Sequence, residues 1–299
     1  PLDAPPPLAA RTPAHAVVPA RRTLSFSALA ASGTDAVADH DGGDPARLGD
    51  PLAEVGPIPA YPRGARVGEC VHLALERIDF ARWPDAAGRA SLDLACRRFR
   101  FSEAEREVFE DWIGQAVNAA LLPGLTLAGL DPAASARELE FHFRLAGSAR
   151  RLEAALALEP RHARDPAEIA RLPARMHGLM HGYIDLVLQH EGRWYVVDYK
   201  TNFLGGELDH YAPQALAAAV REGDYDLQYL IYLVALHRQL RHRLGHAYDP
   251  ERHLGGALYL FLRGMSRDGA RGVHRDRPPV ALVEALDRAF DDSAEQPWP

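Results

Sequence analysis

One β-hairpin constrains the fold of this chain more than any other feature, because its register follows from the sequence. Two runs rich in β-branched and aromatic residues, 182–188 and 193–199, flank a short turn at 191–192 whose glycine can adopt a positive φ. A two-residue turn here fixes every cross-strand pair that follows. It places Asp185 directly opposite Asp198, with Cβ atoms about 5 Å apart.

Two opposed aspartates need a partner, because like charges across a sheet destabilise it. A divalent cation such as Mg²⁺ offsets that repulsion, since it binds one or two carboxylates together with water and phosphate oxygens. Lys200 lies two residues beyond Asp198, on the same face, and is the only lysine among the 34 lysine and arginine residues. This pattern predicts a metal site with a nearby ammonium group. The alternatives are a solvated face with a surface ion pair and a single lysine left by chance.

Composition limits the class of protein. A net charge of −7 argues against bulk attraction to nucleic acid but is compatible with a local basic groove around an acidic, metal-binding site. Two cysteines, Cys70 and Cys96, are too few for a disulfide scaffold or a four-cysteine iron–sulfur cluster, and they favour a reducing compartment. The sequence shows neither a membrane-spanning stretch nor a signal peptide. We therefore expect a cytoplasmic protein with no membrane association.

The chain divides into three parts. Residues 1–65 hold many of the proline and glycine residues and are expected to form a linker or arm. Residues 66–290 are expected to form one α/β domain, and residues 291–299 a tail. The absence of an initial methionine favours a piece of a longer protein.

Hydrophobic spacing predicts the elements of this domain. Three helices should precede the first strand, and the third should open with a capping box formed by Ser102 and Glu105. Further elements are expected as strands at 138–145, 182–188, 193–199 and 253–262, and as helices at 151–158, 211–221, 225–244 and 279–290.

Several motifs in this order resemble the PD-(D/E)xK nuclease superfamily, and in particular RecB-type nuclease domains. They are Gly-Tyr-Ile-Asp-Leu-Val at 182–187, Val-Asp-Tyr-Lys-Thr at 197–201, Tyr-Asp-Leu-Gln-Tyr at 225–229, Leu-His-Arg at 236–238 and the run from Gly255 to Gly264. The resemblance covers residues 66–290. It implies a restriction-endonuclease-like α/β core, with a mixed central β-sheet flanked by helices and an N-terminal helical portion.

The resemblance also implies roles for individual residues. His72, Asp185, Asp198 and the backbone carbonyl of Tyr199 would bind the metal, and Lys200 would be the catalytic lysine beside the two aspartates. From the residues alone, a single histidine in an amphipathic helix is more typical of a hydrogen-bonded partner than of a ligand. The metal is expected to be Mg²⁺, with Mn²⁺ possible because imidazole is an unusual Mg²⁺ ligand.

The resemblance further implies that four residues contact DNA: Thr201, Asn202, Gln228 and Tyr232. Gln228 and Tyr232 stand four apart and so share a helical face, which is also the pattern of an ordinary helix. The basic end of the same helix, residues 238–243, either meets phosphates or complements the helix dipole. Glu140 is either a further acidic member of the site or half of a strand-face ion pair.

The expected activity is metal-dependent hydrolysis of DNA, as in the nuclease domain of a RecBCD-type helicase–nuclease that acts in double-strand break repair and recombination. The resemblance implies RecC-like and RecD-like subunits and attached helicase domains as partners, in a bacterial cytoplasm. No phosphate-binding loop ending in Gly-Lys exists here, because Lys200 follows a tyrosine, so no ATP site is expected. Two alternatives are a catalytically silent nuclease-like module and an Mg²⁺ enzyme that acts on small phosphorylated substrates.

Overall fold

The computed structural model describes residues 23–24, 57–60, 62–170, 172 and 175–291. Most of the arm expected over residues 1–65, and nearly all of the tail at 291–299, therefore lie outside the described residues. Within the described residues, the segment just before the domain packs against it. Ile58 is buried in the core, and its backbone N–H donates to the carbonyl of Gly206 at 2.9 Å.

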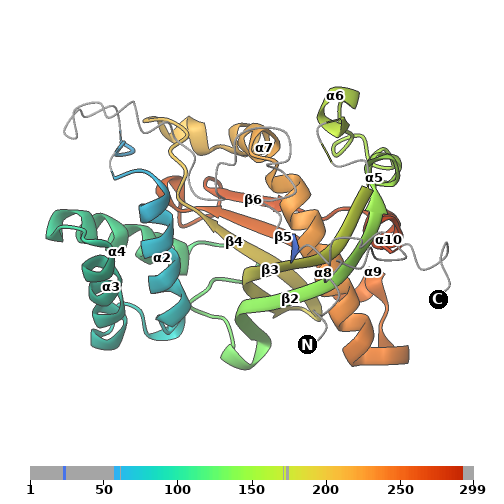
Figure 1. Ribbon diagram of the computed structural model, residues 1–299. Coiled ribbons are helices and arrows are strands. Elements are labelled where there is room, and N and C mark those ends of the chain that lie inside the picture. The colour runs from blue at the N-terminus through green and yellow to red at the C-terminus, as the bar shows by residue number, and fades with distance from the viewer. Residues whose placement is uncertain (1–22, 25–56, 61, 171, 173–174, 292–299) are drawn as a thin grey trace, which may run out of the picture.

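A mixed β-sheet forms the centre of the domain (Figure 1). In the described residues its strands are β1 (Thr23–Leu24), β2 (Ser135–Ser148), β3 (Arg175–His190), β4 (Arg193–Lys200), β5 (Leu254–Phe261) and β6 (Val273–Asp276). The order is β1-β3-β4-β5-β6, with β2 paired to β3. The pairs β2–β3, β3–β4 and β5–β6 are antiparallel, whereas β1–β3 and β4–β5 are parallel. The expected α/β fold with a mixed sheet is confirmed.

Three helices cover one face of the sheet, and a second group covers the other. The first group is α2 (Ala65–Arg77), α3 (Ala86–Phe99) and α4 (Glu103–Asn118). The second is α5 (Ala149–Leu156), α8 (Tyr225–Leu244) and α10 (Val280–Ala289), with α7 (Pro213–Glu222) beside it. Figure 1 shows α2–α4 grouped at one end of the molecule, away from α5 and α10. Two short helices, α6 (Pro166–Ile169) and α9 (Pro250–His253), lie in connections.

The alternation along β5 explains how one sheet supports two cores. Ala257, Tyr259 and Phe261 join the core under α8, whereas Leu258 and Leu260 join the core under α2–α4. Successive side chains of a strand point to opposite faces, so a strand that is buried on both faces carries an unbroken apolar run. α8 is buried along most of its length because the sheet and α10 both pack against it.

The helix limits agree closely with the sequence pattern. The capping box is present: the Ser102 hydroxyl accepts from the Glu105 backbone N–H at 3.4 Å, and the Glu105 carboxylate accepts from the Ser102 backbone N–H at 2.7 Å. α8 spans the predicted range, 225–244.

Three expectations about strands were wrong. The helices do not precede the first strand, because β1 comes before them. β3 begins at Arg175, seven residues before its predicted start, because pairing with β2 along its whole length stabilises a glycine- and histidine-rich stretch of low β propensity. β6 was missed because four residues carry no readable alternation, and only its pairing with β5 makes it a strand.

Candidate active site

The hairpin register is confirmed by the β3–β4 ladder. Leu186 pairs with Val197, and the pairs continue to the turn, where Glu191 and Gly192 have φ values of 49° and 78°. Two positive φ values are typical of the type I′ turn that favours tight hairpins. The ladder ends at Leu186 and Val197, and Asp185 and Asp198 are the next residue on each strand.

Beyond this last pair, a side-chain oxygen of one strand takes the place of a backbone carbonyl as hydrogen-bond acceptor for the other strand. Asp185 Oδ2 accepts a hydrogen bond of 2.8 Å from the backbone N–H of Tyr199. The two strands separate here, and the carboxylate of Asp185 is held at the point where they part. β3 and β4 therefore place one carboxylate each at the same edge of the hairpin.

His72 reaches this point from α2. Its Nε2 lies 2.8 Å from the carbonyl oxygen of Tyr199, and its Nδ1 lies 3.5 Å from Asp185 Oδ1. Burial by itself lowers the pKa of His72, but the carboxylates of Asp185 and Asp198 outweigh burial and raise it to about 9. The structure thus brings together three of the four predicted metal ligands, across 127 residues of sequence.

Lys200 is buried beside the second aspartate, with 7% of its surface exposed. Its Nζ lies 2.9 Å from Asp198 Oδ2 and donates to Gln228 Oε1 at 3.1 Å. The Nζ also lies 4.1 Å from the centre of the Tyr225 ring. An ammonium that is buried this deeply needs such partners, because an unpaired charge in a protein interior is costly.

The four residues predicted to bind DNA lie around this lysine, but three of them are buried. Gln228 Nε2 donates to the hydroxyl of Tyr232 at 3.1 Å, and Asn202 Nδ2 donates to the hydroxyl of Tyr225 at 3.1 Å. Thr201 is 4% exposed, and its carbonyl accepts from a neighbouring arginine. Their role in binding DNA stays a prediction.

Glu138 was missed by the sequence reasoning. It has a φ of 46° and stands opposite Asp185 in the β2–β3 register, between two ladder pairs. Burial, followed by the nearby charge of Asp185, raises the pKa of Glu138 to about 6. Glu138 and His72 line one cavity of about 270 Å³. In the sequence, Glu138 is only an acidic residue in a predicted strand. The irregular backbone at this position, opposite Asp185, is a property of the tertiary structure.

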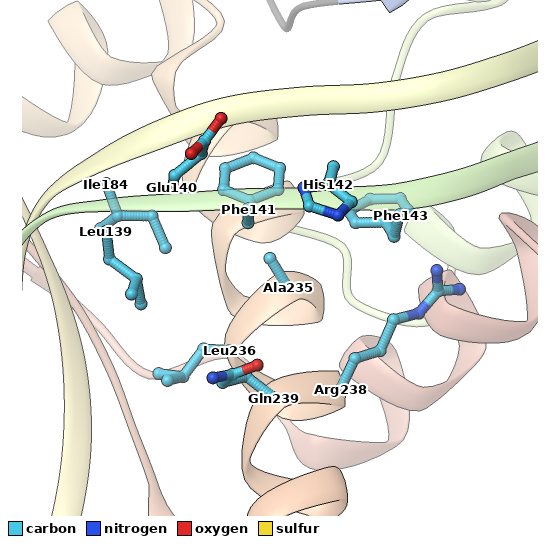
Figure 2. Close-up of a pocket in the computed structure, with 10 residues that line it drawn as sticks. All are labelled: Leu139, Glu140, Phe141, His142, Phe143, Ile184, Ala235, Leu236, Arg238 and Gln239. Carbon is cyan, nitrogen blue, oxygen red and sulfur yellow. The ribbon is translucent and has the colours of Figure 1, made fainter.

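Glu140 forms the strand-face ion pair, not a part of the carboxylate cluster. Its Oε1 lies 2.9 Å from His181 Nε2. The basic end of α8 is partly used inside the protein, because Arg238 and Arg241 both pair with Asp287 of α10. A cavity of about 320 Å³ lies between β2 and α8 (Figure 2), and neither the predicted catalytic residues nor the predicted metal ligands line it.

The donor set is suited to a divalent cation. Two carboxylates, a backbone carbonyl and an imidazole are groups that bind Mg²⁺ or Mn²⁺, with oxygen dominant. Among the described residues, no three His, Cys, Asp or Glu side chains are arranged to hold an ion as they stand. The reason is visible in the contacts: His72 is engaged with Asp185, and Asp198 with Lys200. The excess negative charge that raises the pKa of His72 is the charge that a cation would balance.

The pKa of His72 predicts how stability depends on pH in the metal-free chain. The folded-state pKa of about 9 is above the ordinary value of 6.5, so the charged imidazole stabilises the fold fully below pH 6.5. This contribution is lost as pH rises through 9. In the presence of a chelator, the unfolding temperature of His72→Gln should be lower than that of the parent chain. This difference should be largest below pH 6.5 and should shrink by pH 9. A difference that is constant over this range would contradict the assignment.

In the part of the chain that the structure describes, no helix is both long enough and apolar enough to span a bilayer.

Comparison with known proteins identifies the family of this chain. A profile of the PD-(D/E)XK nuclease superfamily matches residues 48–296. The RecB subunit of the Escherichia coli RecBCD enzyme is 37% identical over 236 residues, which is 77% of this chain and 19% of the relative. RecB of Haemophilus influenzae is 36% identical over 237 residues, with the same coverage. RecB of Mycobacterium tuberculosis is 37% identical over 281 residues, which is 79% of this chain and 24% of the relative. The chain thus spans about a fifth to a quarter of the length of these relatives, and it belongs to the PD-(D/E)XK nuclease superfamily.

Proposed function

We propose that this chain is a metal-dependent DNA nuclease that hydrolyses phosphodiester bonds. The observation that carries the proposal is the meeting of Asp185, Asp198 and Lys200 at one end of the hairpin, with His72 brought to them by α2. The matched relatives are RecB subunits of RecBCD enzymes, which supports a role as the nuclease part of such a helicase–nuclease in double-strand break repair and recombination.

Mg²⁺ is the proposed metal, with Mn²⁺ as a substitute. Asp185, Asp198, His72 and the Tyr199 carbonyl would hold it. When bound, such an ion polarises a phosphoryl oxygen and lowers the pKa of water. His72 must give up its proton to become a ligand, so metal binding is expected to release a proton from a group whose pKa is about 9.

Lys200 is the proposed catalytic lysine. Its ammonium is fixed by Asp198 and Gln228 and therefore needs little reorganisation when a phosphate arrives. A positive charge fixed in this way stabilises the negative charge that develops on phosphoryl oxygens in the transition state, and it can orient the attacking water. Glu138, held near Asp185, is a further carboxylate that can accept a proton, because its raised pKa lies close to neutral pH.

DNA contacts are proposed for Thr201, Asn202, Gln228 and Tyr232. Each bonds to another protein group in this structure, so each would exchange or share that bond on binding DNA. RecC-like and RecD-like subunits and RecB helicase domains are the proposed partners, in a bacterial cytoplasm. The relatives are named as RecB subunits of RecBCD enzymes, which supports assembly with further subunits.

Incubation of the chain with supercoiled plasmid and with end-labelled linear DNA, without ATP, tests the proposal. We expect cleavage with Mg²⁺ or Mn²⁺ and none when a chelator is added. Absence of cleavage with both ions, or cleavage that persists in the chelator, would contradict it. Cutting of the circular substrate would show that the chain acts as an endonuclease, whereas attack on linear DNA alone would show dependence on ends.

A further inference from the structure

Three exposed arginines lie over phenylalanine rings around one end of the domain. The guanidinium carbon of Arg63 is 3.8 Å from the centre of the Phe203 ring. The corresponding distances are 4.6 Å for Arg66 over Phe101 and 5.8 Å for Arg98 over Phe99. All three arginine side chains are exposed, whereas the three rings are half-buried. The same arrangement thus occurs three times. Arg63 precedes α2, Arg66 lies in the first turn of α2, and Arg98 lies in the last turn of α3.

These arginines lie next to the candidate active site. Arg98 lines the cavity of about 270 Å³ that also contains His72 and Glu138. Arg66 stands seven residues before Leu73, so the two share a face of α2, and Leu73 lines the same cavity. Phe203, which carries Arg63, follows Lys200 by three residues at the end of β4. Arg98 thus lines the cavity, Arg66 lies on the face of α2 that borders it, and Arg63 lies against a residue that follows Lys200 closely.

Stacking on a ring prepares an arginine to bind a phosphate. The ring faces one side of the planar guanidinium and limits its motion, while N–H groups at its edge remain available. In Arg63 the Nε–H donates to the carbonyl of Ala60 at 2.6 Å, which leaves the terminal N–H groups for a ligand. Those N–H groups match the oxygens of a phosphate in a bidentate arrangement, which a lysine ammonium cannot reproduce. The chain as a whole has a net charge of −7, so this cluster opposes the overall charge at the place where an anionic substrate would enter.

We propose that Arg63, Arg66 and Arg98 form a phosphate-binding rim that holds the DNA backbone at the entrance to the active site. The inference rests on the proposed nuclease function and adds to it the surface that recognises the substrate. Single-stranded and double-stranded DNA share the phosphodiester backbone, and the affinities measured for each show which one is preferred. Each phosphate contact contributes about 0.9 to the slope of log affinity against log salt for a duplex and about 0.7 for a single strand.

The test measures DNA binding without metal, in the Asp198→Ala background, so that no cleavage occurs. Affinity for a labelled single strand and for a labelled duplex is measured over a series of KCl concentrations. For the triple variant Arg63→Gln, Arg66→Gln, Arg98→Gln, we expect the slope to fall by about 2 to 3 on the preferred substrate. A triple variant with lysine at the same positions keeps the charge but loses the stacked fork, so it should keep the slope and bind more weakly. A glutamine triple variant whose slope equals that of the parent would overturn the proposal.

Arg150→Gln is the matched control. Arg150 is exposed on α5, which lies at the other end of the molecule from α2 and α3 (Figure 1), and this variant should keep the parent slope. Because this control removes one charge and the test variant removes three, a fall in slope of about 0.7 to 0.9 in the control would show a non-specific charge effect and would also overturn the rim.

Failure of the rim and failure of the nuclease function give different results. If the parent chain cuts DNA but the glutamine triple variant has the slope of the parent, the nuclease proposal stands and the rim is overturned. If the slope falls as expected in the triple variant but the parent chain does not cut DNA in Mg²⁺ or Mn²⁺, the rim stands and the nuclease proposal is overturned. A parent chain that does not bind DNA overturns both. Thermal unfolding of each variant shows whether it is folded.

Discussion

Replacing Asp198 with alanine is expected to abolish metal-dependent DNA cleavage. Asp198 follows the last paired residue of β4 and pairs with Lys200 at 2.9 Å, so its loss removes a proposed metal ligand and the partner of the proposed catalytic lysine together. We expect the initial rate on end-labelled duplex DNA, at saturating Mg²⁺, to fall by about a thousandfold or more. Cleavage near the parent rate would show that Asp198 is not part of the active site.

Because the alanine variant leaves a buried ammonium without its carboxylate, a second variant separates catalysis from folding. Asp185→Asn removes the charge but keeps an oxygen that can accept from the Tyr199 backbone N–H. Because Asp185 is the main partner of the charged His72, this variant should unfold at a lower temperature than the parent below pH 6.5, but close to the parent temperature by pH 9, and it should lose cleavage. Asp111→Asn, an exposed position on α4, is the control and should change neither activity nor unfolding temperature.

Lys200→Arg is expected to lose most of the activity although it keeps the positive charge. The ammonium occupies a site bounded by Asp198, by Gln228 and by the Tyr225 ring, and only 7% of the lysine is exposed. A guanidinium is wider, planar and unable to give up a proton, so it cannot place its charge at the same point. Displacement of a charge that stabilises a transition state costs about a hundredfold or more in kcat.

Lys200→Met supplies the comparison, because it keeps the length of the side chain and removes the charge. If geometry decides, arginine and methionine should both reduce kcat strongly while the affinity for DNA in the absence of metal stays near the parent value. A Lys200→Arg variant with near-normal kcat would show that charge alone suffices and that the single lysine of this chain has no special role. Unfolding temperatures of both variants show whether the larger side chain has disturbed the core.

The parts of the fold that were predicted correctly depend on local interactions. The Ser102–Glu105 capping box involves residues three apart, and α8 shows its limits through helical spacing. The hairpin register follows from a two-residue turn, because the side chains of the flanking strands alternate with a fixed period of two. By contrast, β1 and β6 are strands only through their partners, and nothing in two or four residues of sequence shows which partner they have.

The same distinction holds within the site. Asp185, Asp198 and Lys200 could be placed together from the sequence because they lie on one hairpin. The position of His72 followed only from the resemblance, because α2 must pack on the sheet before its imidazole can meet Tyr199. Glu138 could not be found, because a φ of 46° in mid-strand is not a property of the residue type.

The sequence by itself therefore determined the hairpin, its register and the placement of two aspartates and the single lysine at its open end, since these depend on the two-residue period of a strand and on one turn. The tertiary structure decided what surrounds that face. It brought His72 to Asp185, Gln228 to Lys200, and Arg63 and Arg66 onto their rings, because these contacts join segments whose separation in space is set by how helices pack against a sheet. Local geometry thus supplied the proposed reacting groups, and long-range packing supplied their partners and the rim inferred to receive the substrate.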